Sequence, residues 1–339
     1  MALERRRRNQ VPHSWRKIAI SLIERPNTSV LSSAPMYRWN SVALFILLSQ
    51  LCCAAQGNGC TERTLIVTAR DADHRKALLS TLQTFDLRGK INGKPMQILA
   101  SRKPATPTRV VLVLDASGSM SSKWETALEF AARVVKESGE YTQFAIVAFA
   151  DKELKKVEFN KTGPDFINEV MTFQSVKPYG RTALRNAIWE AATMLRSGAE
   201  GDAIVVVSDG IADHSTVPLR RIQEAIWELG IRVMFVQLVD HYLASQSQGG
   251  DDMDAYWLSQ SSGGFLFRAE NPQVLPNIAH VIALEIENYL SVRIKLPTPL
   301  EKDASVHFEA VDASGHKPKN IELGFPEKLL PCTTAISAP

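Results

Sequence analysis

A continuous apolar run at residues 110–114 is followed at once by the polar stretch 115–119. The run is short, rich in β-branched residues and without a polar break, which is typical of a strand buried on both faces. A second run of the same kind, 203–207, leads into Ser208 and Asp209. Strands of this type belong to parallel sheets covered by helices, and open sheets bind ligands beyond the carboxyl ends of their strands. The two strand ends therefore predict where a functional site lies.

Strand and helix patterns alternate from residue 108 to residue 290. The strand patterns lie at 110–114, 144–149, 154–159, 203–207, 233–239 and 265–267. The helical patterns lie at 123–136, 166–173, after Thr182, and at 218–229, 254–260 and 276–289. Alternation at this spacing predicts an α/β fold, with a doubly wound, mainly parallel sheet flanked by helices.

Small accessory β segments are expected at both ends of this region. Residues 61–102 contain three short strand patterns, and the Asn-Gly pair at 92–93 is a strong hairpin signal. Residues 291–339 begin with two alternating segments, which we expect to pack on the N-terminal β module. A proline-containing linker at 103–108 separates that module from the α/β region, and residues 246–252 are expected to form a surface loop.

Residues 1–55 differ from the rest of the chain and are interpreted as a leader. A short apolar run, 42–51, ends in Cys52-Cys53-Ala54-Ala55, which fits a signal peptide over about 36–55, with 1–35 an over-extended start. The run is too short to span a bilayer comfortably. We therefore expect export to the periplasm, cell surface or exterior of a bacterial cell. The alternative is an uncleaved N-terminal anchor, which would be the chain's only attachment to a membrane.

Removal of the leader changes the charge of the chain. The leader holds eight Lys/Arg and two Asp/Glu, so the remaining 31 basic and 34 acidic residues give about −3 instead of +3. Neither the charge nor any basic patch favours nucleic-acid binding. Cys60 and Cys332 remain after cleavage, and in an oxidising compartment they either pair or stay as two free thiols.

The stretch after the first buried strand offers only hard oxygen donors. Asp115, Ser117 and Ser119 alternate, and neither sulfur nor imidazole accompanies them. Such a set suits Mg²⁺, Mn²⁺ or Ca²⁺ and argues against Zn²⁺ or copper. The alternative is a Ser/Gly-rich turn that caps a helix. Met120 is expected either at the rim of this site or in the packing of the first helical turn.

Two further loops carry oxygen donors at comparable places. Thr182 follows a Pro- and Gly-containing turn and precedes a helical pattern, so its alternative role is a helix N-cap. Asp209 follows the second buried strand and precedes Gly210, so its alternative role is that of a turn residue.

In this order the three loops resemble the von Willebrand factor type A (VWA) domain. Residues 115–119 match its Asp-x-Ser-x-Ser signature, and 180–184 match its Gly-x-Thr-Ala-Leu. The resemblance implies a metal-ion-dependent adhesion site with Ser117 and Ser119 as direct ligands. It implies that Thr182, Asp115 and Asp209 contribute directly or through water. Mg²⁺, or Mn²⁺ or Ca²⁺, would then bridge to an exposed Asp or Glu of a partner protein, and the chain would not be an enzyme.

The sequence disfavours several classes of enzyme. A hydrolase using Asp209, His214 and a site serine is disfavoured because the chain has no Gly-x-Ser-x-Gly elbow. The chain also has no P-loop, which disfavours an ATPase, and Ser117 stands where a phosphotransferase needs a second Asp. A structural envelope protein with a vacant site remains open. The sequence leaves open which protein is the partner, which cation binds and which oligomer forms.

Overall fold

The computed structural model describes residues 61–71, 86–102, 108–196, 201–209, 214–239 and 252–331, all within one compact unit, Leu51–Pro339. The predicted leader, Cys60, Cys332, residues 103–107 of the linker and residues 246–251 of the surface loop lie outside these ranges. Predictions about them stay predictions. None of the helices in the described ranges is both long and apolar enough to cross a membrane.

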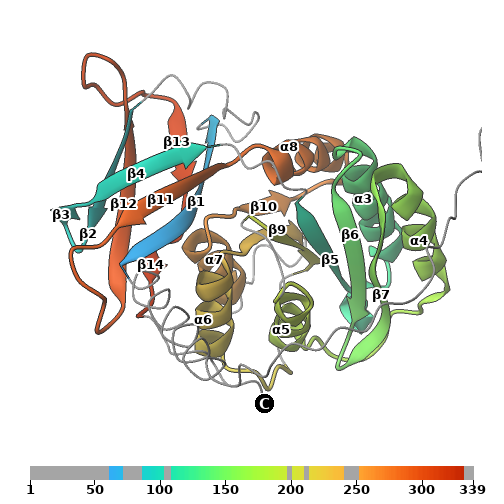
Figure 1. The fold of residues 1–339 in the computed structure, drawn as a ribbon. Helices are drawn as coiled ribbons and strands as arrows, with labels where there is room; N and C mark the ends of the chain where they lie inside the picture. Colours follow the sequence, from blue (N-terminus) through green and yellow to red (C-terminus); the bar gives the residue numbers. More distant parts are fainter. Residues whose placement is uncertain are drawn as a thin grey trace, which may run out of the picture. The chain divides into compact units, whose positions relative to one another are not determined.

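A six-stranded sheet forms the centre of the α/β region, in the order β10-β9-β8-β5-β6-β7 (Figure 1). Its strands are β5 (Arg109–Asp115), β6 (Gln143–Phe149), β7 (Glu153–Thr162), β8 (Ala203–Ser208), β9 (Arg232–Leu238) and β10 (Leu266–Ala269). All neighbours pair in parallel except β6 and β7, which are antiparallel. The predicted doubly wound, mainly parallel sheet is thus confirmed.

Helices cover both faces of this sheet. The helices are α3 (Trp124–Glu137), α4 (Ile167–Met171), α5 (Leu184–Met194), α6 (Leu219–Leu229), α7 (Asp252–Ser261) and α8 (Leu275–Glu287), with short 3₁₀ turns η1 (Gly118–Met120) and η4 (Pro272–Val274). On one face of the sheet, α3, α4 and α8 pack against Val110, Leu112 and Leu114 of β5. On the other face, α5, α6 and α7 pack against Val111 and Val113. Side chains alternate along a strand, so one continuous apolar run supplies both cores.

One local prediction is wrong. Residues 166–173 form no single helix but the succession η2 (Gly163–Phe166), α4 and η3 (Thr172–Ser175). Phe166, Val170 and Phe173 are nevertheless buried, because spacings of four and three residues keep side chains on one face of a helical segment. The alternative role of Thr182 as a helix cap is excluded, because the N-cap of α5 is Ala183, without a side-chain hydrogen bond.

Strands from both ends of the chain share two accessory sheets. Their orders are β13-β1-β11-β4 and β14-β12-β2-β3. The strands are β1 (Glu62–Asp71), β2 (Asp86–Ile91), β3 (Lys94–Pro95), β4 (Gln97–Arg102), β11 (Leu290–Lys295), β12 (Ala304–Val311), β13 (Ile321–Gly324) and β14 (Lys328–Leu329). At the predicted hairpin, Asn92 and Gly93 have φ of 49° and 77°, as a two-residue turn between β2 and β3 requires.

The accessory strands contact the α/β region at the turn between α7 and β10. Ser262 forms a β-bridge with Pro326, and the Thr68 hydroxyl donates to the carbonyl of Gly263 at 3.4 Å. A Cβ on Gly263, which has φ of 80°, would lie 2.9 Å from the Cα of Phe325. Only glycine permits so close an approach of two backbones.

Candidate metal centre

Asp115 is the last residue of β5 and is fully buried. Its Oδ1 accepts a hydrogen bond from the amide of Ser117 at 2.9 Å, and its Oδ2 accepts one from the Ser208 hydroxyl at 2.6 Å. Ser208 comes from the end of β8, which pairs with β5 as far as Leu114 and Val207. The two strand ends therefore hold the carboxylate in one orientation.

Burial raises the pKa of Asp115 to about 6. Hydrogen bonds from Ser208 and Ser117 oppose this rise, and the nearby negative charge of Asp209 adds to it. A cation at this place would favour the ionised form of Asp115.

The turn after β5 presents two hydroxyls. Ser117 is buried and Ser119 is exposed, and their Oγ atoms lie 3.1 Å apart. Met120, the next residue, is buried in the core below α3, so its role is packing and not contact at the rim.

The loop before α5 is fixed against this turn. The amide of Tyr179 donates to the carbonyl of Ala116 at 2.9 Å, and the amide of Gly118 donates to the carbonyl of Gly180 at 3.0 Å. Thr182 follows in the same loop and is 3% exposed. Backbone contacts thus bring the Thr182 loop to the turn that carries Ser117 and Ser119.

Asp209 directly follows β8. Its carbonyl accepts a hydrogen bond from Nε2 of Gln237 at 3.4 Å. Its side-chain Oδ1 is buried and has no hydrogen-bond partner among the residues that the structure describes. A buried polar atom without a partner is rare and calls for an explanation, such as a water or an ion.

Asp115 and Asp209 form no ion pair with any described basic side chain. Among the described residues, no group of three or more His, Cys, Asp or Glu side chains lies close enough together to bind a metal ion. A cation at this edge would therefore depend on hydroxyl ligands beside the two carboxylates. That donor set fits a hard cation such as Mg²⁺.

The five residues predicted from the sequence all lie at the carboxyl edge of the sheet. Hydrogen bonds join Asp115, Ser117 and Ser119, while Asp209 acts on Asp115 through its charge and Thr182 joins through its loop. Sequence reasoning missed Ser208, which orients Asp115. The signal was present, because Ser208 ends the second buried run beside Asp209.

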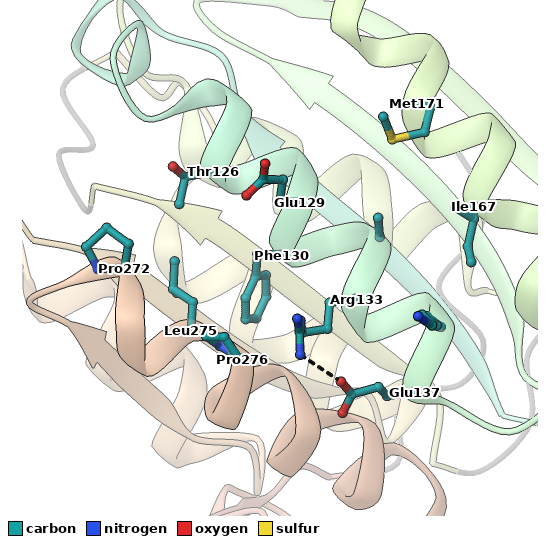
Figure 2. A pocket seen from close by; sticks show the side chains of 12 residues that line it. Thr126, Glu129, Phe130, Arg133, Glu137, Ile167, Met171, Pro272, Leu275 and Pro276 are labelled. Carbon is teal, nitrogen blue, oxygen red and sulfur yellow. Dashed lines mark hydrogen bonds and ion pairs between the residues drawn. The ribbon is translucent and has the colours of Figure 1, made fainter.

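A pocket of about 460 Å³ lies away from this edge, among α3, α4 and the start of α8 (Figure 2). Apolar Phe130, Ile167 and Leu275 line it together with charged side chains, among them the ion pair of Arg133 and Glu137 at 3.3 Å. It contains none of the five predicted residues, so we place the candidate site at the strand ends and not in the pocket.

Residues 110–280, which are 171 of the 339 residues, match the von Willebrand factor type A domain. The chain belongs to the VWA family. No curated protein matches the chain.

Solved structures similar to this VWA protein include BatB, a conserved hypothetical protein from Bacteroides thetaiotaomicron, with 19% identity and a TM-score of 0.41. That match covers 52% of this chain and 98% of BatB. A von Willebrand factor type A protein from Catenulispora acidiphila matches with 12% identity, 73% and 74% coverage and a TM-score of 0.43. The pilus adhesin SpaC from Lactobacillus rhamnosus GG matches with 9% identity, 77% and 47% coverage and a TM-score of 0.44.

Proposed function

We propose that this VWA domain is a metal-dependent protein-binding module of the adhesion type. Asp115, Ser117, Ser119, Thr182 and Asp209 would hold one divalent cation. The observation that carries the proposal is a cluster of oxygen atoms at one sheet edge that includes a buried, unpartnered Oδ1 of Asp209. Family membership and the hydroxyl pair of Ser117 and Ser119 support it.

Each residue would have a distinct task. Asp115 is fixed by two hydrogen bonds and supplies buried negative charge. Ser117, Ser119 and Thr182 supply neutral oxygens, so few negative charges contact the cation. A bound Mg²⁺, or Mn²⁺ or Ca²⁺, supplies an open coordination position that a carboxylate can fill.

The ligand would accordingly be an exposed Asp or Glu of another protein. A hydrolytic role for the same serines has less support. His214, the histidine nearest in sequence to the third loop, contacts the site through its backbone amide, which donates to the carbonyl of Thr182 at 3.2 Å. No side-chain hydrogen bond joins His214 to Ser117 or Ser119 within the described part of the chain.

Calorimetric titration with Mg²⁺ and Mn²⁺ tests the metal site. We expect one cation to bind the unaltered chain and none to bind the double variant Ser117→Ala, Asp209→Ala. The fold should survive, because both side chains lie at the sheet edge and not in either apolar core. Circular dichroism checks this point.

The matched control replaces a serine and an aspartate at the same edge that are not proposed ligands. Ser122→Ala with Asp151→Ala removes two exposed side chains and should leave cation binding unchanged. If the site variant binds the cation as well as the unaltered chain does, the assignment is wrong. The domain would then be a structural VWA domain without a functional metal site.

A further inference from the structure

Backbone hydrogen bonds tie the segment 177–181 to the turn that carries Ser117 and Ser119 of the proposed metal site. The amide of Tyr179 and the carbonyl of Gly180 both bond to the turn after β5, and the amide of Ala183 donates to the carbonyl of Ala150 at 2.7 Å. Gly180 has φ of 79°, and a Cβ there would lie 3.4 Å from the carboxyl group of Asp151. The backbone of the segment is therefore held in place before any partner arrives.

Three side chains of this segment are exposed. Lys177 and Arg181 carry positive charge, and Tyr179 is 49% exposed although its own amide is fixed. A large aromatic residue that is left in solvent on a rigid loop is typical of an interface hot spot. Its ring offers apolar area at little cost in conformational entropy.

Lys177 and Arg181 form no ion pair with any described residue. Basic residues on the neighbouring elements β7 and α5 do have partners. The Lys156 ammonium lies 2.9 Å from Glu190, and the Arg185 guanidinium lies 3.5 Å from Asp254. Lys177 and Arg181 thus remain available, and the exposed Asp151 lies beside Gly180 of the segment.

We infer that Lys177, Tyr179 and Arg181 recognise the residues that flank the bridging carboxylate, so that the partner is an acidic protein segment with at least two neighbouring Asp or Glu residues. This inference rests on the proposed function. One acid of the partner would occupy the metal site, and a second would pair with Arg181 or Lys177. Guanidinium groups suit this role because they bind carboxylates in a bidentate manner.

Peptide binding to the full chain tests the inference. One labelled peptide carries a single Asp in a Gly/Ser frame, and a second carries the same Asp flanked by two Glu residues. Fluorescence anisotropy is measured in saturating Mg²⁺ and again in EDTA. We expect the triacidic peptide to bind about tenfold more tightly than the monoacidic one, because charge complementarity at the rim sets specificity.

The charge-reversal variant Lys177→Glu, Arg181→Glu should remove this preference and leave Mg²⁺ binding in the calorimeter unchanged. Lys94→Glu with Lys302→Glu makes the same change in net charge on exposed residues of the accessory segments, and it should keep the preference. Tyr179→Ala should weaken the binding of both peptides.

The outcomes separate two failures. Mg²⁺-dependent binding of both peptides with equal affinity, or an acid preference that survives the charge reversal, overturns the inference and leaves the proposed function standing. Binding that persists in EDTA, or no binding of either peptide, counts against the proposed function and removes the basis of the inference with it.

Discussion

Glu285 on α8 allows a test of how a buried carboxyl group affects the pH dependence of the protein's stability. Its side chain is fully buried, and neither carboxylate oxygen has a hydrogen-bond partner among the described residues. Burial raises the pKa of Glu285 from 4.5 to about 7, although the positive charges of Arg70 and Arg232 oppose the rise and Glu322 adds to it. We predict that Glu285→Gln makes the protein less sensitive to pH.

The sign follows from proton linkage. Between pH 4.5 and about 7 the native state holds a proton on Glu285 that the unfolded chain has released. The free energy of unfolding therefore falls as the pH rises through this window and changes no further above it. With about 1.4 kcal/mol for each pH unit, the loss between pH 5 and pH 8 is roughly 2–3 kcal/mol.

Thermal unfolding of both proteins at pH 5 and pH 8 measures this effect. Other groups also titrate, so the informative quantity is the difference between Glu285→Gln and the unaltered chain at each pH. We expect the difference in melting temperature, variant minus unaltered chain, to rise by about 3–5 °C from pH 5 to pH 8. Glu270→Gln, at an exposed site, should show no such shift. A Glu285→Gln difference that is the same at both pH values would refute the reasoning.

Two further predictions concern the binding site and the leader. Thr182→Val keeps the shape of the side chain but removes the hydroxyl, so it should weaken Mg²⁺-dependent partner binding at least about tenfold. Thr182→Ser keeps the hydroxyl and should not weaken binding. Surface plasmon resonance measures the affinity of both variants. Loss of a helix cap would not explain the weaker binding, because the N-cap of α5 is Ala183. For the leader, N-terminal sequencing of the exported protein should find Gln56 at or near the start, and an intact leader on a membrane-bound product would support the anchor instead.

The central fold could be predicted because each buried strand is a continuous apolar run. Residues 110–114 and 203–207 admit no polar face, so they had to lie inside a sheet that helices cover on both sides. The same runs placed Asp115 and Asp209 at the strand ends. They also place Ser208 at this edge, but they do not show that its hydroxyl bonds to Asp115, because a hydroxyl at a strand end has many equivalent local partners.

The accessory sheets could be predicted only in part. Alternation identified the strand patterns at 64–68 and 290–296, but it tells which face of a strand is buried and not which strand is its neighbour. The pairing of β1 with β11, from Glu62↔Lys295 to Val67↔Leu290, joins residues more than two hundred positions apart. Glu285 was missed for a related reason, since its burial depends on charged residues such as Arg70 of β1 that come from the other end of the chain.

Buried charged side chains have different partners at the two edges of the central sheet. At the amino edge, Asp202 accepts from the Arg109 guanidinium at 2.7 Å, and Arg232 donates to the carbonyls of Gly201, Glu285 and Ile286. At the carboxyl edge, Asp115 and Asp209 have hydroxyl and amide donors nearby but no described cationic partner. A buried carboxylate without a counter-charge is costly. The divalent cation that we propose for the carboxyl edge would supply that counter-charge.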